Sequence, residues 1–450
     1  MNILTLLHCL QPNLAKTDLR RMSRVVQAIL SMTGRVTMLG ISRWAGKGGS
    51  YRTVQRFFNT VIPWAEVFAQ FFKQHLYLPE GEYILAGDES VVTKSGKMTY
   101  GLDYFFSGLL NKTVKSIAIF SLALVSVEER QAYPLQVEQV VRSPEEKAAA
   151  NTRKAKRTKK DPHAPKKKPG RPKGSKNRDK TQVELTPELL RIQKMVKKQL
   201  SILRSWVTVR YLALDGHFGN NNALQMVRQC GLHIISKLRY DAALYFVYDG
   251  PQKPCGPRKR YGQKIDYRRI PDQYLVEKST EGHIETRIYQ AQMLHREFAQ
   301  PLNVVIITKT HLKTGAFAHV NLFSSDPELT YDKVVEYYSL RFQIEFNFRD
   351  AKQYWGLEDF MNIKEVPLTN ALNLSLFMVS LSQALLREFR QTHPDSGILD
   401  LKAYFRAAKY LEETIKMLPQ KPEPFLLQQL FGHLSSLGRI HPVNVPVSSP

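Results

Sequence analysis

The stretch YSLRFQIEFNFRDAK, residues 338–352, determines how we interpret the fold of this chain. Its apolar residues recur at helical spacing, and one stripe of the helix is polar: Tyr338, Arg341, Glu345 and Lys352. At about 100° per residue, these four side chains fall within an arc of about 60°. Apolar residues flank the arc on both sides, so we expect the stripe to be partly buried. An internal ladder of salt bridges and a catalytic surface both fit this pattern.

The rest of the same segment extends the prediction along the chain. We expect one long helix that spans about Lys333 to Tyr354. A second polar arc, formed by Gln343, Asn347 and Asp350, lies on its far side and is expected to face water.

Two acidic residues lie where apolar, strand-like runs end. Asp88 follows Tyr83–Gly87, and Asp215 follows Tyr211–Leu214. Strand ends are where an α/β sheet exposes functional side chains. The alternative is that each aspartate only starts a turn, as Gly216 after Asp215 would favour.

With Glu345, these two aspartates would form a set of three carboxylates from two strand ends and one helix. Such a set can hold two divalent metal ions about 4 Å apart. Mg²⁺ suits oxygen ligands, and Mn²⁺ can substitute for it. Arg341 and Lys352 would then neutralise phosphates beside the reacting one, and Tyr338 would hydrogen-bond a phosphate or stack on a base.

The polar stripe reproduces a known signature, Y-x2-R-x3-E-x6-K, at all four positions. The chain therefore resembles the DDE transposases of the insertion-sequence-four type. Asp88 with Lys94–Lys97 is similar to the family's first acidic region, and Asp215–Gly219 to its second. The resemblance covers roughly residues 80–360.

This resemblance implies a fold and an activity. The fold is α/β, an RNase H-like mixed-sheet catalytic core with a β-rich insertion, plus helical N-terminal and C-terminal regions. The activity is metal-dependent cleavage and strand transfer of double-stranded DNA by Asp88, Asp215 and Glu345, with two Mg²⁺ ions. The partners are the terminal inverted repeats of an element and its target DNA, bound by a homodimer.

Changes in composition along the chain indicate the domain boundaries. Residues 240–325 are rich in β-branched and aromatic side chains, which predicts strands. The expected parts are a helical DNA-binding domain, 1–78; the core, 79–239 and 326–365; the insertion, 240–325; a helical region, 366–440; and a loose tail, 441–450.

The N-terminal region contains a possible helix-turn-helix. A helical pattern from Val36 to Trp44 is followed by a glycine-rich turn, and Ser50 can cap a second helix. Arg52, Gln55 and Arg56 would be the side chains presented to a DNA groove. Ordinary packing of two helices explains the same pattern.

The charge of the chain points to a polyanionic partner. The formal net charge is +25, with a pI near 9.8. Residues 142–180 carry 16 lysines or arginines and four acids, so this segment is expected to be a disordered loop. Within it, Lys168–Gly174 is similar to an AT-hook, in which Arg171 and Lys173 would contact an A·T minor groove. A generic basic tether is the alternative.

The remaining features concern compartment and rival functions. The three cysteines are scattered and fit a reducing cytoplasm. The resemblance implies a bacterial protein at the nucleoid. No membrane role follows, because the apolar run Ile117–Val127 is strand-sized. Two rivals are an inactive transposase that acts as a sequence-specific DNA-binding protein and a two-metal nuclease without strand transfer.

Overall fold

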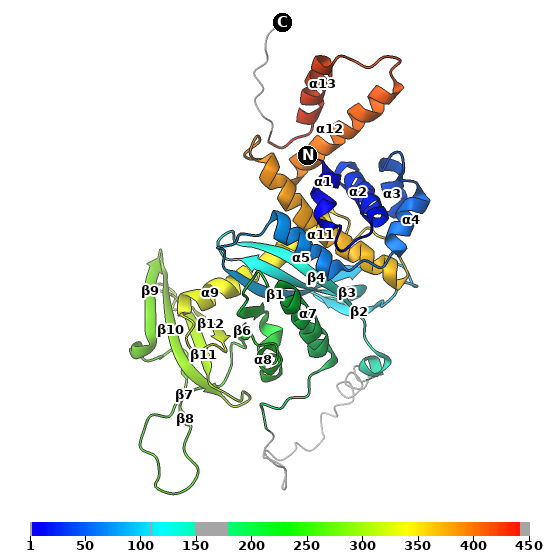
Figure 1. The fold of residues 1–450 in the computed structure, drawn as a ribbon. Coiled ribbons are helices and arrows are strands. Elements are labelled where there is room, and N and C mark those ends of the chain that lie inside the picture. The colour runs from blue at the N-terminus through cyan, green and yellow to red at the C-terminus, as the bar shows by residue number, and fades with distance from the viewer. Residues whose placement is uncertain (1, 109, 149–178, 442–450) are drawn as a thin grey trace.

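A computed structural model describes residues 2–108, 110–148 and 179–441 and shows a mixed α/β architecture (Figure 1). One mixed sheet of twelve strands runs through the molecule, with helices packed on its faces. The expected fold class, an RNase H-like core with added helical regions, is confirmed.

The core of the sheet is built around β1, which ends its buried part just before Asp88. An antiparallel meander joins β1 to β3 and β4, while β5 and β6 run parallel to β1. Helices α7 and α8 supply the connections that parallel strands need. The elements are β1 Tyr83–Thr93, β2 Asp103–Ser107, β3 Lys112–Ser126, β4 Gln131–Val140, α7 Pro187–Leu203, β5 Tyr211–Leu214, α8 Asn221–Arg228 and β6 His233–Leu238.

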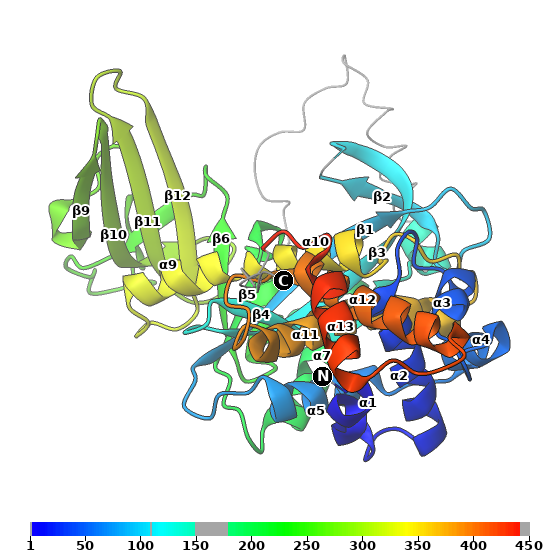
Figure 2. The same ribbon diagram turned by 90° about the horizontal axis from the view of Figure 1, so that it is seen from above.

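The β-rich segment after β6 continues the same sheet. Strand β12 pairs antiparallel with β6, from Asn321 opposite Leu238 to Ser324 opposite Ile235. Figure 2 shows β9 to β12 extending to one side of the core. The strands are β7 Leu244–Val247, β8 Tyr261–Lys264, β9 Leu275–Glu281, β10 Ile284–His295, β11 Leu302–His311 and β12 Phe317–Ser324.

The single long helix predicted from Lys333 to Tyr354 is wrong. The structure has two helices, α9 (Tyr331–Leu340) and α10 (Gln343–Tyr354), with a tight turn between them. Phe342 N bonds to Ser339 O at 3.1 Å and Ile344 N to Arg341 O at 3.1 Å, which are the short-range bonds of a tightened turn. The break lets Arg341 reach the sheet and leaves Phe342 47% exposed.

The polar arc expected to face water is also wrong in its centre. Asn347 is 1% exposed, because β4 and helix α11 (Glu365–Phe389) pack against α10 on that side. Its amide nitrogen and oxygen have no hydrogen-bond partner within the described residues. Sequence polarity therefore misplaced this side of α10.

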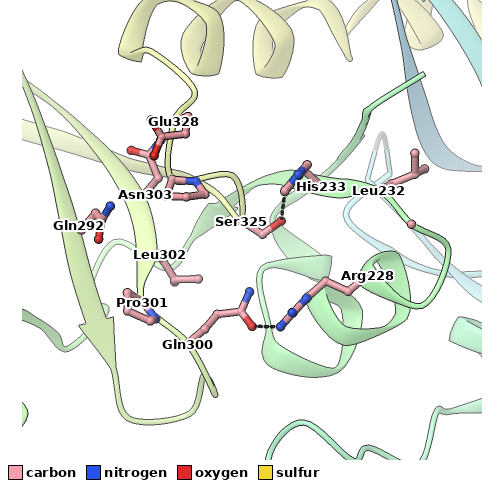
Figure 3. A pocket seen from close by; sticks show the side chains of 12 residues that line it. Arg228, Leu232, His233, Gln292, Gln300, Pro301, Leu302, Asn303, Ser325 and Glu328 are labelled. Carbon is pink, nitrogen blue, oxygen red and sulfur yellow. Dashed lines mark hydrogen bonds between the residues drawn. The ribbon is translucent and has the colours of Figure 1, made fainter. Parts of the chain in front are cut away.

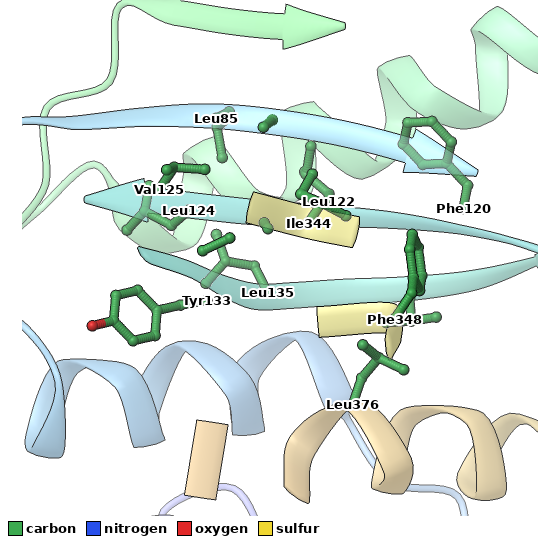
Figure 4. Packing of buried hydrophobic residues seen from close by; sticks show 14 of the residues in the cluster. Leu85, Phe120, Leu122, Leu124, Val125, Tyr133, Leu135, Ile344, Phe348 and Leu376 are labelled. Atoms are coloured by element: carbon green, nitrogen blue, oxygen red, sulfur yellow. The ribbon is translucent and has the colours of Figure 1, made fainter. Parts of the chain in front are cut away.

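The core beneath the site is apolar and continuous. Figure 4 shows Leu85, Leu122 and Leu135 from neighbouring strands beside Ile344 and Phe348 of α10. Burying each such side chain contributes roughly 1.5–3 kcal/mol. Helix α11 is long and apolar enough to cross a membrane by length and composition, but 83% of its most apolar window is buried in this core.

Helices at both ends complete the molecule. The glycine turn between α3 and α4 has positive φ at Gly46 and Gly48, and the Ser50 hydroxyl caps α4 by accepting from Thr53 N at 3.4 Å. At the other end, α12 and α13 project from the body (Figure 1). The elements are α1 Ile3–Leu7, α2 Lys16–Ser31, α3 Met38–Trp44, α4 Tyr51–Asn59, α5 Trp64–His75, α12 Ile398–Met417 and α13 Pro424–Ser436.

The basic segment 142–180 is only partly described. Residues 144–148 are helical, and Ser143 and Glu146 cap each other's backbone N–H, which corrects the expected disorder at this edge. The possible AT-hook with Arg171 and Lys173 lies outside the described residues, as do residues 442–450 of the predicted tail.

Candidate active site

The two predicted aspartates lie side by side on neighbouring strands. In the parallel pairing of β1 and β5, Gly87 stands opposite Leu214. Asp88 follows Gly87 in the chain, and Asp215 follows Leu214. Two short apolar runs, whose aspartates are 127 positions apart (215 − 88), therefore place two carboxylates side by side in the sheet. Asp88 is not at a strand end as predicted, because β1 continues to Thr93.

The turn after Asp215 is fixed by hydrogen bonds. One Asp215 carboxylate oxygen accepts from His217 N at 3.1 Å, and Ser236 Oγ of β6 donates to Asp215 O at 2.7 Å. A Cβ atom added to Gly219 would lie 2.1 Å from Lys237 O, so only glycine fits there. This close approach explains the glycine that follows the second aspartate.

Arg341 connects Asp88 to the predicted third acid. Its guanidinium forms an ion pair with Asp88 Oδ2, and its Nη2 lies 3.7 Å from Glu345 Oε1. The Arg341 side chain is only 12% exposed, whereas Glu345 is 46% exposed. The structure thus brings Asp88, Arg341 and Glu345 into one chain of charge contacts.

Burial controls the protonation of these carboxylates. Loss of solvent raises the pKa of Asp88, and the attraction of Arg341 offsets only part of that effect. Loss of solvent also raises the pKa of Glu345, again with Arg341 acting in the opposite direction and Asp88 reinforcing the rise. The positive charge of Arg341 therefore does not fully offset the loss of solvent at either carboxylate.

The other two residues of the polar stripe are separated by the break in the helix. The Arg341 guanidinium lies 5.8 Å from the centre of the Tyr338 ring, so Tyr338 stays beside the site. Lys352 instead donates to the O atom of Val91, further along β1, at 3.1 Å, and it lies 3.5 Å from Glu358. Arg341 and Lys352 therefore contact different positions along β1 instead of meeting at one point.

The chemistry of Asp88, Asp215 and Glu345 suits a divalent metal ion, but their present positions do not. Within the described residues, no group of three or more His, Cys, Asp or Glu is close enough to hold a metal ion. The donors are nevertheless carboxylate oxygens, as Mg²⁺ prefers, and partial loss of solvent raises the pKa of both Asp88 and Glu345. Arg341 occupies the position of a counter-charge between Asp88 and Glu345, so sharing a metal requires that guanidinium to withdraw.

A cavity of about 360 Å³ opens beside the aspartates and was not predicted from the sequence. It is lined by Asp88 and Asp215 together with Glu89, and by Glu188 and Arg191 of α7. His217 Nε2 lies 3.4 Å from Glu188 Oε1, and this contact raises the pKa of His217. The position of Glu89 next to Asp88 was the only signal in the sequence, because the cavity depends on where α7 packs.

A second cavity of about 540 Å³ lies away from the carboxylates (Figure 3). It separates α8 and the start of β6 from the insertion, and Arg228 hydrogen-bonds Gln300 across it. His233, at its wall, begins β6, whereas Asp215 stands at the opposite, C-terminal end of the neighbouring strand β5. This cavity belongs to the joint between core and insertion rather than to the site.

The predicted groove-binding side chains lie in the N-terminal helices. Arg52, Gln55 and Arg56 are all exposed on α4, one turn apart, while Val54 and Phe57 on its other side are buried. Within the described part of the chain, their side chains make no hydrogen bond or ion pair with the carboxylates of the candidate site or with any other group.

Comparison with known proteins adds an independent observation. The family model described as "DDE superfamily endonuclease" matches residues 9–299, which is more than half of the chain. The matched region contains Asp88 and Asp215 and ends before Glu345. A search of curated proteins finds no match to this chain.

Proposed function

Because the chain belongs to the DDE superfamily of endonucleases, we propose that it is a transposase of the insertion-sequence-four type. It would cleave DNA at the ends of a mobile element and join those ends to target DNA. The family membership itself implies a nuclease that acts on DNA. Strand transfer, the insertion-sequence-four type and the residues that act are the proposed part.

One observation carries the proposal: the parallel pairing of β1 and β5 places Asp88 beside Asp215, and Arg341 links Asp88 to Glu345. Carboxylates on adjacent strands with an acid from a helix are what two-metal phosphoryl transfer uses. An ordinary salt-bridge ladder would not require an aspartate from each of two neighbouring strands.

The residues of the chain can be given separate roles. Asp88, Asp215 and Glu345 would hold two Mg²⁺ ions, and bound ions of this kind activate the attacking oxygen and stabilise the leaving one. Arg341, released from Asp88, and Lys352 would bind the phosphates next to the scissile bond. Tyr338 would orient the same strand through its hydroxyl or its ring.

The decisive experiment compares cleavage of an element-end duplex in Mg²⁺ by the wild type and by Asp88→Asn, Asp215→Asn and Glu345→Gln. Each variant should lose cleavage by a factor of about 10³ or more while it still binds the duplex. Asp350→Asn, on the same helix as Glu345, is the matched control and should cut normally. A variant in the first group that cuts at the wild-type rate removes its residue from the catalytic set.

The two rival functions separate in the same assay. A wild type that binds the duplex but never cuts would be an inactive transposase that acts as a DNA-binding protein. Cutting without joined products on added target DNA would indicate a nuclease without strand transfer.

Three further elements of the proposal are independent of catalysis. Arg52, Gln55 and Arg56 of α4 would contact duplex DNA, and Arg171 and Lys173 an A·T-rich minor groove. The enzyme would pair two ends as a homodimer in the bacterial cytoplasm, at the nucleoid. Arg171→Ala should lower the affinity for A·T-rich duplexes more than the affinity for G·C-rich duplexes. An equal loss of affinity for both would exclude a minor-groove hook.

A further inference from the structure

The edge strand β2 carries two largely exposed aromatic side chains, and neither lies against another aromatic ring within the described residues. Tyr104 is 62% exposed and Phe106 is 61% exposed, whereas Phe105 between them is 3% exposed and lines the cavity beside the aspartates. Rings of this size are usually buried or partnered. Two of them on alternate positions of one strand form an outward face.

The strand registers put this face on the same side of the sheet as Asp88. Asp88 pairs with Ser121 of β3, and Tyr104 and Phe106 pair with Lys115 and Thr113 of the same strand. Directly paired residues share a face, and so do residues an even number apart along a strand. Ser121, Lys115 and Thr113 are odd-numbered, and no irregularity interrupts either pairing.

The separation from Asp88 suits a flanking contact. The levels of Asp88 and Tyr104 are six residue steps apart along β3 (121 − 115), which is about 20 Å at about 3.3 Å per residue. That is roughly the length of six base-pair steps. DNA centred on Asp88 would pass over the β2 face a few nucleotides from the scissile bond.

The charge of residues 94–115, which include β2, favours a polyanionic partner over a second protein surface. Residues 94–115 contain four lysines and one acid, Asp103. Asp103 is already neutralised by Arg142 at 3.6 Å and Lys147 at 3.9 Å. Lys115 stands directly opposite Tyr104 on the outward face.

We propose that the β2 face, Tyr104 and Phe106 with Lys115, binds unpaired DNA that flanks the cleavage site. Successive outward side chains of a strand are about 6.6 Å apart, so each ring can stack on a different base of an extended strand. Stacking on sheet-borne aromatic residues beside basic ones is how proteins hold single strands. This inference rests on DNA being the substrate of the proposed function, and it adds that the DNA beside the cut is locally melted.

The test is fluorescence anisotropy with the full-length protein, in chelator, using an oligothymidylate and a duplex of equal length. Tyr104→Ala/Phe106→Ala should lower single-strand affinity about tenfold or more, with less than about a threefold effect on the duplex. Tyr104→Phe/Phe106→Tyr keeps both rings and should match the wild type. Met417→Ala/Phe425→Ala, which removes side chains that are 85% and 69% exposed on α12 and α13, should also match it.

Several results would overturn the inference. They are equal losses on both DNAs, no loss on the single strand, or a ring-swapped variant as weak as the alanine variant. Should the alanine variant unfold, ultraviolet crosslinking of wild type to bromouracil-containing single strands decides, because crosslinks must map to Tyr104 or Phe106. A wild type that fails to cleave DNA but shows this ring-dependent binding would contradict the proposed function. The inference that the β2 face binds single-stranded DNA would still hold.

Discussion

At the scale of single residues, Arg341 determines how the site behaves without metal. It supplies positive charge to two carboxylates whose pKa values burial has raised. The same guanidinium is proposed to bind phosphate during the reaction. Metal and DNA would therefore enter by taking over the partners of Arg341.

Arg341→Gln should lower the stability of the metal-free protein by about 3 kcal/mol, because it leaves Asp88 partly buried and unpaired. Added Mg²⁺ should then raise the melting temperature of the variant more than that of the wild type, since the metal no longer competes with a guanidinium. Differential scanning fluorimetry with and without Mg²⁺ measures both effects. Arg349→Gln, which breaks the pair between Arg349 (57% exposed) and Asp350 (14% exposed) on the same helix, is the control. An unchanged response to Mg²⁺ in Arg341→Gln would refute the competition.

At the scale of elements, the turn from β5 to α8 positions Asp215 through one close contact. Gly219→Ala would place a methyl group 2.1 Å from Lys237 O, whereas the same change at Gly216 meets nothing nearer than 3.6 Å. Gly219→Ala should therefore cost about 2 kcal/mol and most of the cleavage activity, and Gly216→Ala should cost little of either. Urea unfolding and the cleavage assay test this pair. Similar behaviour of the two variants would mean that the turn adapts freely.

Helix α4 provides the second prediction at this scale. Arg52→Ala/Arg56→Ala should weaken duplex binding and reduce the slope of log affinity against log salt by about 2, if each arginine neutralises one phosphate. Arg20→Ala/Lys421→Ala removes the same charge from exposed positions elsewhere and should leave the slope unchanged. Salt titrations of duplex affinity provide the measurement, and equal slopes for all three proteins would remove α4 from the interface.

Elements also show what sequence patterns could and could not predict. The apolar runs before Asp88 and Asp215 and the Ser50 cap were local signals, and each strand or helix was predicted from them. The break at Arg341 and Phe342 has no glycine or proline to mark it, so periodicity joined α9 to α10. Asn347 was placed in water because its polarity is local, whereas its burial depends on α11 and β4, which pack against it from elsewhere in the chain.

At the scale of the whole molecule, Asp400 ties the end of the described chain to the start of α12. Its carboxylate accepts from Gly397 N at 2.8 Å and from His441 N at 3.1 Å. Burial alone would raise the pKa of Asp400, but these hydrogen bonds lower it from 3.8 to about 2. The folded state thus favours the ionised form.

The stability from Asp400 should be complete above pH 3.8 and be lost as the pH falls toward 2. Between pH 5 and pH 3, the wild type should lose about 1 kcal/mol more unfolding free energy than Asp400→Asn, which cannot titrate. Urea unfolding at the two pH values gives this difference. Parallel losses in the two proteins would show that the Asp400 contacts do not persist in solution.

The pairing of β12 with β6 has a mechanical consequence for the enzyme. Because backbone hydrogen bonds run without interruption from the insertion through β6 and β5 to β1, that module cannot swing like a lid on a hinge. DNA that reached both the insertion and the carboxylates would therefore have to bend to fit the protein. Deleting residues 240–325 would leave β6 as an unpaired edge strand that is prone to aggregation, rather than produce a minimal nuclease.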